Sequence, residues 1–180
     1  MHTSNVSPLL IEELPFGRFG EYRDLVLAAR KSDPFAFSPE PSECQTTIDS
    51  VDAWKDRLVR QSRFPFQLFF LEAGGTLIGM GGIKFHHDER FQHNAHLQSL
   101  YVRQEYRRRG FGRLLVEKRL EFLKQQPGIR NVLCEIFSSQ VPSLQIHFRC
   151  GFRRCGRVDK FLHVNGVFYD SLLLQKDLRN

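Results

Sequence analysis

The feature that most constrains this chain is a basic, glycine-containing stretch, Arg107-Arg108-Arg109-Gly110-Phe111-Gly112, set between two regularly patterned segments. Before it, β-prone residues over 96–102 predict a strand. After it, apolar residues recur at helical spacing and predict an amphipathic helix; they are Leu114, Leu115, Val116, Leu120, Phe122 and Leu123. A strand that turns through two glycines into a helix leaves several backbone N–H groups unpaired at the helix start. The stretch therefore predicts an anion-binding turn.

The start of this helix suits a pyrophosphate in particular. Unpaired N–H groups, the helix dipole and three arginines all favour negative charge there, and glycine lets a phosphate approach the backbone closely. Two common phosphate-binding motifs do not fit. The chain contains no Gly-x-x-x-x-Gly-Lys-Ser/Thr string, and a Gly-x-Gly-x-x-Gly pattern starting at Gly110 would need glycine where Leu115 stands.

The loop resembles the pyrophosphate loop of the GNAT acetyltransferase superfamily, whose pattern is Gln/Arg-x-x-Gly-x-Gly/Ala. Arg107, Gly110 and Gly112 occupy its three fixed positions. The resemblance implies acetyl-coenzyme A as co-substrate, bound by the loop and by the end of the strand before it. The implied contacts are Leu100, Tyr101, Val102, Arg107, Arg108, Arg109, Gly110, Phe111, Gly112 and Arg113.

The resemblance continues in order from about residue 66 to the C-terminus. The segments that carry it are two strands, 66–73 and 76–85, joined at Gly74-Gly75; a strand over 131–137; a short helix over 142–149; Gly151-Phe152; and a final hairpin, 160–164 and 167–174. Asn165-Gly166 suits a type I′ turn in that hairpin. The implied fold is an α/β GNAT fold, with a mixed, mostly antiparallel sheet of six to seven strands and helices on both faces.

Two positions depart from the family pattern. Gln140 stands where the family usually has asparagine, and its amide can still bind the pantetheine of the cofactor. His147 stands where the family's tyrosine often protonates the departing thiolate. An imidazole with a pKa near 6.5 can serve as that acid. The alternative is that His147 is only a polar residue on a half-exposed helix face.

The implied reaction is direct transfer of an acetyl group from acetyl-coenzyme A to a primary amine in a ternary complex. The amine must attack in its neutral form, so a general base or a water chain is useful. Gln98 occupies the strand position where many relatives carry glutamate, and His96 and Glu135 are the nearest replacements. Backbone N–H groups at Leu100 to Val102 would polarise the thioester carbonyl.

The acceptor is a small-molecule amine or a protein or peptide amine, and the N-terminal third carries the information on it. We expect a strand over 9–14 and helices over 18–30 and about 51–61. Between the helices, the segment from Asp33 to Asp52 holds five acidic residues and no lysine or arginine. In the family this insertion walls the acceptor site, so an acidic wall favours a cationic amine. The alternative is a solvated loop.

Composition limits the other function classes. The 180 residues predict one domain, 1–180, and no apolar run is long enough to span a membrane. The first residues lack the pattern of a secretion signal, so we expect a cytoplasmic protein. No metal is expected, because His86, His87, His93 and His96 fit no common structural zinc site.

The net charge of +6 raises a nucleic-acid-binding domain as an alternative. The basic residues cluster around the loop and the following helix, however, as the phosphates of coenzyme A would require, and no nucleic-acid-binding motif is present. A non-catalytic acyl-coenzyme A-binding protein is a further alternative, because the family's glutamate and tyrosine are absent. Exposed strand edges make a homodimer plausible.

Overall fold

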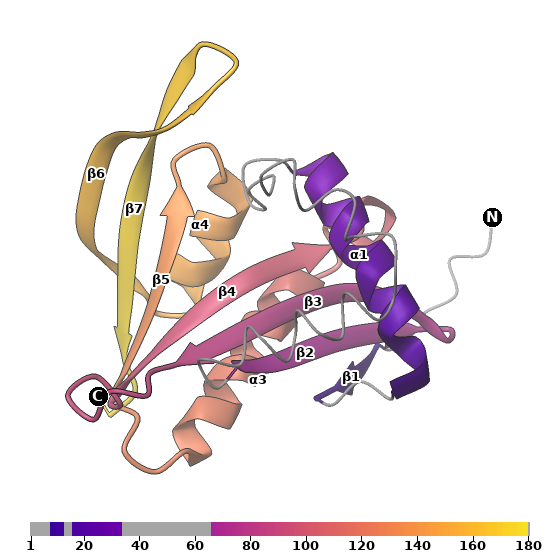
Figure 1. Cartoon of the computed structure of the whole chain (residues 1–180), viewed down its shortest axis with the longest axis horizontal. Coiled ribbons are helices and arrows are strands. Elements are labelled where there is room, and N and C mark those ends of the chain that lie inside the picture. The colour runs from indigo at the N-terminus through magenta and orange to yellow at the C-terminus, as the bar shows by residue number, and fades with distance from the viewer. Residues whose placement is uncertain (1–7, 13–15, 34–65, 180) are drawn as a thin grey trace.

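The computed structural model describes residues 8–12, 16–33 and 66–179. Figure 1 shows one sheet with helices on either side of it. The elements in chain order are β1 (Leu9–Ile11), η1 (Phe16–Arg18), α1 (Phe19–Ser32), β2 (Phe66–Ala73), β3 (Thr76–Phe85), β4 (Asn94–Val102), η3 (Gln104–Tyr106), α3 (Phe111–Gln125), β5 (Asn131–Phe137), α4 (Val141–Arg149), β6 (Arg153–Val164) and β7 (Val167–Asp177).

The sheet has seven strands in the order β1-β2-β3-β4-β5-β7-β6. All neighbours pair antiparallel except β4 and β5, which run parallel. Their pairing covers only Asn94–His96 of β4 against Asn131–Leu133 of β5. Beyond these residues the two strands diverge, as the ribbon shows between β4 and β5 (Figure 1). The expected mixed, mostly antiparallel sheet is confirmed, and its centre is split.

Helices cover both faces of the sheet, as expected. On one face, α1 packs over β3 through its buried residues Tyr22, Leu25, Val26 and Ala29. On the other, α3 packs over β2, β3 and β4 and also contacts α4. Each helix buries one apolar stripe of the kind that a 3.6-residue period predicts. None of the helices within the described ranges is long and apolar enough to cross a membrane.

A bulge in β4 fixes which way the end of that strand faces. Gly82 of β3 pairs with Gln98, but Met80 pairs with Tyr101, so β4 carries one residue more than β3 over this interval. Ser99 takes a left-handed conformation there, with φ of 56°. Because side chains alternate along a strand, one extra residue exchanges the two faces. As a result Tyr101 packs in the cluster under α1, and Val102 packs in the cluster under α3.

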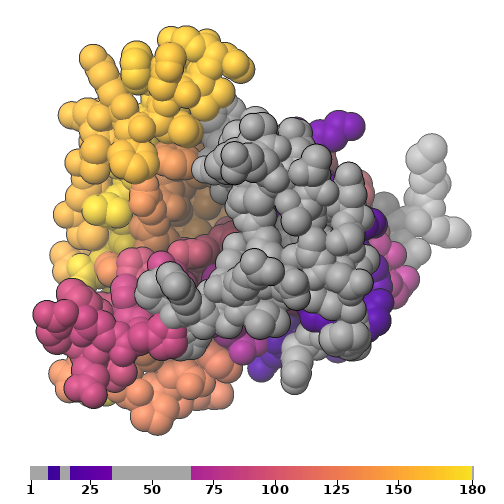
Figure 2. Space-filling view, in the orientation of Figure 1, coloured from indigo at the N-terminus to yellow at the C-terminus, as the bar shows by residue number. Residues whose placement is uncertain are grey.

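The ends of the chain differ more from the sequence expectations. The Asn165-Gly166 turn is confirmed, with φ of 51° and 79° at its two residues, and the tip of this hairpin projects beyond the rest of the sheet (Figures 1 and 2). Strand β6 starts at Arg153 rather than near 160. The sequence did not indicate its first half, because most of its side chains are exposed and apolar residues do not alternate along it. Strand β1 ends at Ile11. The helix expected over about 51–61 lies outside the described residues.

Candidate active site

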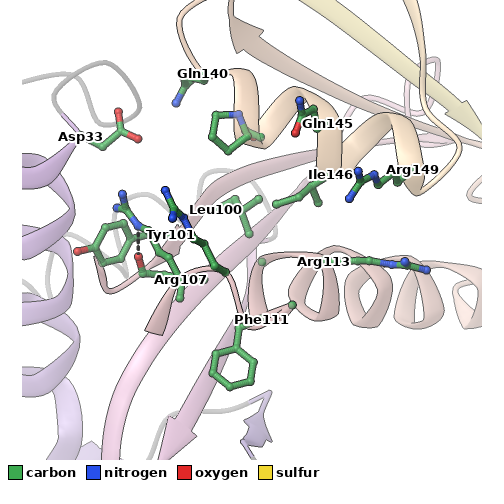
Figure 3. Close-up of a pocket in the computed structure, with 16 residues that line it drawn as sticks. Asp33, Leu100, Tyr101, Arg107, Phe111, Arg113, Gln140, Gln145, Ile146 and Arg149 are labelled. Carbon is green, nitrogen blue, oxygen red and sulfur yellow. Dashed lines mark hydrogen bonds between the residues drawn. The ribbon is translucent and has the colours of Figure 1, made fainter. Parts of the chain in front are cut away.

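A pocket of about 750 Å³ lies between the ends of β4 and α1 and the N-terminal ends of α3 and α4. Figure 3 shows side chains from these elements converging on it. It is lined by Asp33, Leu100, Tyr101, Val102, Arg107, Arg108, Gly110, Phe111, Gly112, Arg113, Gln140, Pro142, Ser143, Gln145, Ile146 and Arg149. Nearly all of the residues expected to bind the cofactor therefore meet in one place, which is the gap left by the divergence of β4 and β5.

The start of α3 presents backbone donors to this pocket. Gly110 is the N-cap residue, with φ of 85°, and no side chain caps the helix. Glycine is the residue that adopts this left-handed conformation without strain. Gly110 and the first three helical residues, Phe111 to Arg113, all line the pocket. An uncapped helix start attracts anions through its N–H groups and its dipole.

Four arginines add positive charge to the pocket wall. The Nε of Arg107 donates a hydrogen bond to the carbonyl of Val102 at 2.9 Å, and its guanidinium lies over the ring of Tyr101. Arg108 also lines the pocket, and Arg113 does so while it pairs with Glu117 at 2.7 Å. The fourth, Arg149, comes from the last turn of α4. This concentration of charge suits a ligand with several phosphates.

The sequence placed the short helix α4 at the cofactor through Gln140 and His147, but it missed the helix residues that line the pocket, and one expected arginine lies elsewhere. Pro142, Ile146 and Arg149 follow one another at spacings of four and three residues, so they share a helix face. That spacing could have identified Arg149. Arg109, in contrast, was expected at the cofactor but lies over the ring of Tyr106 and is not among the residues that line the pocket. Of these two neighbouring arginines, Arg108 alone lines the pocket.

Gln140 is the N-cap residue of α4 and lines the pocket. Its Oε1 accepts a hydrogen bond from the backbone N–H of Phe137 at 3.2 Å, which holds the amide group at the end of β5. The amide nitrogen lies on the pocket side (Figure 3). The side chain can therefore donate a hydrogen bond into the pocket, as expected of a residue that binds the pantetheine of the cofactor.

His147 does not face the pocket. Its side chain is only 3% exposed, packs edge-on against Phe152 and donates through Nδ1 to the carbonyl of Ser143 at 2.8 Å. Burial lowers the pKa of His147 to about 4. The imidazole is therefore neutral near pH 7 and faces the core. Ile146 and Arg149 of α4 line the pocket, and His147 lies on the opposite side of the helix. Its position does not fit the role of the acid.

This burial predicts a pH-dependent contribution to stability. The pKa of His147 is lower in the folded chain than its ordinary value of about 6.5, so the unfolded chain binds this proton more tightly. The free energy of unfolding should therefore fall as the pH drops from about 6.5 to about 4, by up to about 3 kcal/mol from this one group. Chemical denaturation at pH 7 and pH 4.5 measures the change, and His147→Phe should remove that part of it. An equal pH dependence in the variant would contradict the buried, neutral imidazole.

The two expected general bases also lie away from the pocket. His96 pairs with Leu133 at the parallel contact of β4 with β5, several residues before Leu100, and its ring lies 5.0 Å from that of His86. Burial and the nearby charges of His86 and Lys84 lower the pKa of His96. Glu135 is exposed and accepts a hydrogen bond from the hydroxyl of Ser171 at 2.6 Å. Neither residue lines the pocket.

Asp33 is the one acidic residue among the described residues that line the pocket. It is the C-cap residue of α1, where its backbone N–H bonds to the carbonyl of Ala29. In Figure 3 its carboxylate points into the pocket from the side of α1, across from α4. A contact between Ser32 Oγ and the Tyr101 hydroxyl, at 3.2 Å, joins this end of α1 to β4. The other acids of the segment up to Asp52 lie outside the described residues.

Comparison with known proteins agrees with this geometry. The model of the acetyltransferase (GNAT) family matches residues 27–152. The SPbeta prophage-derived uncharacterized N-acetyltransferase YokL of Bacillus subtilis is 21% identical over 149 residues, which cover 83% of this chain and 81% of YokL.

Two solved structures share the fold at low identity. A ribosomal-protein-alanine N-acetyltransferase from Brucella melitensis has a TM-score of 0.76 at 20% identity, covering 94% of this chain and 99% of that one. The putative acetyltransferase yncA from Salmonella typhimurium, solved with its cofactor acetyl-CoA, has a TM-score of 0.77 at 15% identity, covering 97% of this chain and 95% of that one.

Proposed function

Because this chain belongs to the acetyltransferase (GNAT) family, we propose that it transfers the acetyl group of acetyl-coenzyme A to a primary amine. The observation that carries this proposal is the pocket in the divided sheet, where an uncapped helix start and four arginines meet. A ligand with a pyrophosphate and a further phosphate satisfies both features, and the pocket volume of about 750 Å³ lies within the range of small-molecule sites.

Each part of the pocket has a distinct role in this proposal. The N–H groups at the start of α3 hold the pyrophosphate, and Arg108, Arg113 and Arg149 neutralise the phosphates. The amide nitrogen of Gln140 donates to a carbonyl of the pantetheine arm. Coenzyme A supplies the acetyl group as a thioester, and the residues of this chain orient it. These assignments rest on the residues that line one cavity.

The end of β4 offers donors for the thioester carbonyl. Pairing between β4 and β5 ends at His96, so the following residues of β4 border the gap. The carbonyl of Val102 faces this gap, where it accepts the hydrogen bond from Arg107. N–H and C=O groups of alternate strand residues point to the same edge. We therefore assign the N–H groups of Leu100 and Val102 to the carbonyl oxygen, where they stabilise negative charge as it develops.

The acceptor enters from the side of α1, where Asp33 supplies negative charge. A cationic amine is attracted there and releases one proton to water before it attacks. Its nitrogen then forms a bond to the carbonyl carbon, the carbon–sulfur bond breaks, and the thiolate takes up the proton that the new amide loses. The reaction thus converts a neutral amine and a thioester into an amide and a thiol.

One observation favours a second candidate, a protein that binds acyl-coenzyme A without transferring the acyl group. His147, His96 and Glu135 all lie away from the pocket, so none of the side chains expected to move protons reaches it. The two candidates share the coenzyme A site and differ in their chemistry alone.

A single set of assays tests both candidates. We expect calorimetry to show coenzyme A binding that weakens as salt is added, because arginines supply much of the attraction. Thiol release from acetyl-coenzyme A should then depend on an added primary amine. Tight binding with no thiol release over a panel of diamines, aminoglycosides and peptide N-termini would favour the non-catalytic candidate. No binding at millimolar coenzyme A would contradict both.

A further inference from the structure

Arg119 of α3 is a charged residue buried under the sheet, outside the pocket. Its side chain has no exposed surface. Its Nε donates to the carbonyl of Leu115, one turn earlier in α3, at 3.0 Å. Its Nη1 donates to the carbonyls of Gly82, at 3.0 Å, and Gln98, at 3.1 Å. The guanidinium therefore ties α3 to two neighbouring strands.

This guanidinium remains charged although no acid in the described part of the chain pairs with it. Burial lowers the pKa of Arg119 to about 10, so it stays protonated near pH 7. Within the described residues all of its hydrogen-bond acceptors are backbone carbonyls, and its Nη2 has no partner. Burying a charge without an opposite charge is costly. A leucine or methionine would fill this position at lower cost, so packing alone does not account for an arginine here.

Two glycines of β3, Gly79 and Gly81, make room for this arrangement. A Cβ on Gly81 would lie 2.9 Å from the Cζ and Nε of Arg119, and a Cβ on Gly79 would lie 2.9 Å from the carbonyl oxygen of Tyr101. The absence of both side chains lets α3 approach the sheet closely enough for Arg119 to reach the strand carbonyls. The guanidinium of Arg119 therefore occupies the space that a side chain at position 81 would need.

The carbonyls that Arg119 holds mark the start of the β4 bulge. Gly82 and Gln98 are the last paired residues before the bulge, and pairing resumes with Met80 and Tyr101. Ser99, directly after Gln98, has the left-handed conformation. A bulge weakens the strand ladder locally, and two hydrogen bonds from one rigid group offset that weakness. The residues that follow, Leu100 to Val102, line the pocket.

We propose that Arg119 is a positioning residue that clamps β3 and β4 at the bulge and thereby aims the N–H groups of Leu100 and Val102 into the pocket. This inference rests on the proposed function, because those N–H groups are the donors assigned to the thioester carbonyl. It is specific to the guanidinium: a planar group with several fixed donors can reach two carbonyls of different strands and one of its own helix together.

The test uses Arg119→Met, which keeps much of the length and removes the donors. We expect kcat to fall about 10-fold or more, since small misplacements of catalytic groups have large effects on rate, while the Kd for coenzyme A changes less than about 3-fold. Amide hydrogen exchange over residues 98–102, measured without any ligand, should become about 10-fold faster. Arg119→Lys should give intermediate values, because it keeps a charge and a donor.

Lys118→Met is the matched control. It removes a cation from the same turn of α3, but Lys118 is exposed and pairs with Glu121, so kcat and exchange should stay unchanged. Gly81→Ala provides an independent variant, because its Cβ displaces the guanidinium. It should lower kcat in the unmodified protein and much less in the Arg119→Met background. If Arg119→Met does not fold, Gly81→Ala and Arg119→Lys carry the test.

A folded Arg119→Met protein with unchanged kcat or unchanged exchange over 98–102 would overturn the inference. The same holds if kcat and coenzyme A affinity fall together, since that pattern indicates general damage. Failure of the proposed function is a different result: the unmodified protein would release no thiol with any amine, whatever the exchange measurement shows for Arg119→Met.

Discussion

Gly112→Val is expected to weaken coenzyme A binding at least about 100-fold, which corresponds to about 2.7 kcal/mol, while the protein stays folded. Gly112 is the second residue of α3 and lines the pocket, and a Cβ there would lie 3.0 Å from Cδ1 of Ile146 on α4. The two methyl groups of valine reach further still. They would occupy the space that a pyrophosphate needs to approach the backbone N–H groups and would push α4 away.

The measurement is a calorimetric titration with coenzyme A, together with a thermal unfolding curve. Gly112→Ala serves as the graded variant, because Ile146 can give way to a single methyl group, and we expect only a several-fold loss of affinity. Gly20→Val serves as the control for a valine in a helix, since a Cβ on Gly20 meets no atom within 4 Å. If Gly112→Val binds coenzyme A with unchanged affinity, this pocket is not the coenzyme A site.

Asp33→Asn is expected to lower kcat/KM for cationic amines about 10- to 100-fold, because a carboxylate close to an ammonium in a partly desolvated cleft can contribute several kcal/mol of attraction. Asp33 is the one carboxylate among the described pocket-lining residues, and it lies on the α1 side, away from α4 (Figure 3). The loss should shrink as salt is added. The Kd for coenzyme A should hardly change, since the arginines bind the phosphates.

Steady-state rates with a diamine and with a zwitterionic amino acid of similar size measure this effect. The unmodified protein should prefer the diamine, and Asp33→Asn should reduce that preference. Asp24→Asn is the matched control, because Asp24 lies on the same helix, is exposed and pairs with Arg23. Equal turnover of the two amines by the unmodified protein would refute an acidic acceptor site and leave the coenzyme A site untouched.

Local sequence was sufficient for the elements whose conformation depends on neighbouring residues. The strand, turn and helix around Gly110 lie where the pattern predicted them, because glycine at a left-handed position and an apolar stripe are local signals. The Asn165-Gly166 turn is predictable for the same reason. The buried face of α1, from Tyr22 to Ala29, could likewise be predicted, because a helix that covers a sheet buries every third or fourth residue.

The positions of the side chains that we expected to be catalytic were not predictable in this way. A short helix such as α4 has two candidate faces. The sequence assigned His147 to the face at the cofactor, but Ile146 and Arg149 are the residues that line the pocket. Which face turns inward depends on how α4 packs against α3, an earlier helix of the chain, and against Phe152, which follows α4. His96 and Glu135 were chosen by counting along strands, but β4 diverges from β5 after His96, so strand position did not imply closeness to the pocket.

The sequence by itself thus determined that a glycine-containing turn joins a strand to a helix. Its resemblance to the GNAT family implied a mixed sheet with helices on both faces, which the structure confirms. The tertiary structure alone decided which charges are buried and where the sheet opens. Arg119 resembles its basic neighbours in the sequence, yet it is buried because Gly81, on a strand far away in the chain, leaves room for it. The bulge at Ser99 exchanges the faces of Tyr101 and Val102 in the same manner. Both outcomes come from contacts between segments distant in sequence, and no local pattern encodes them.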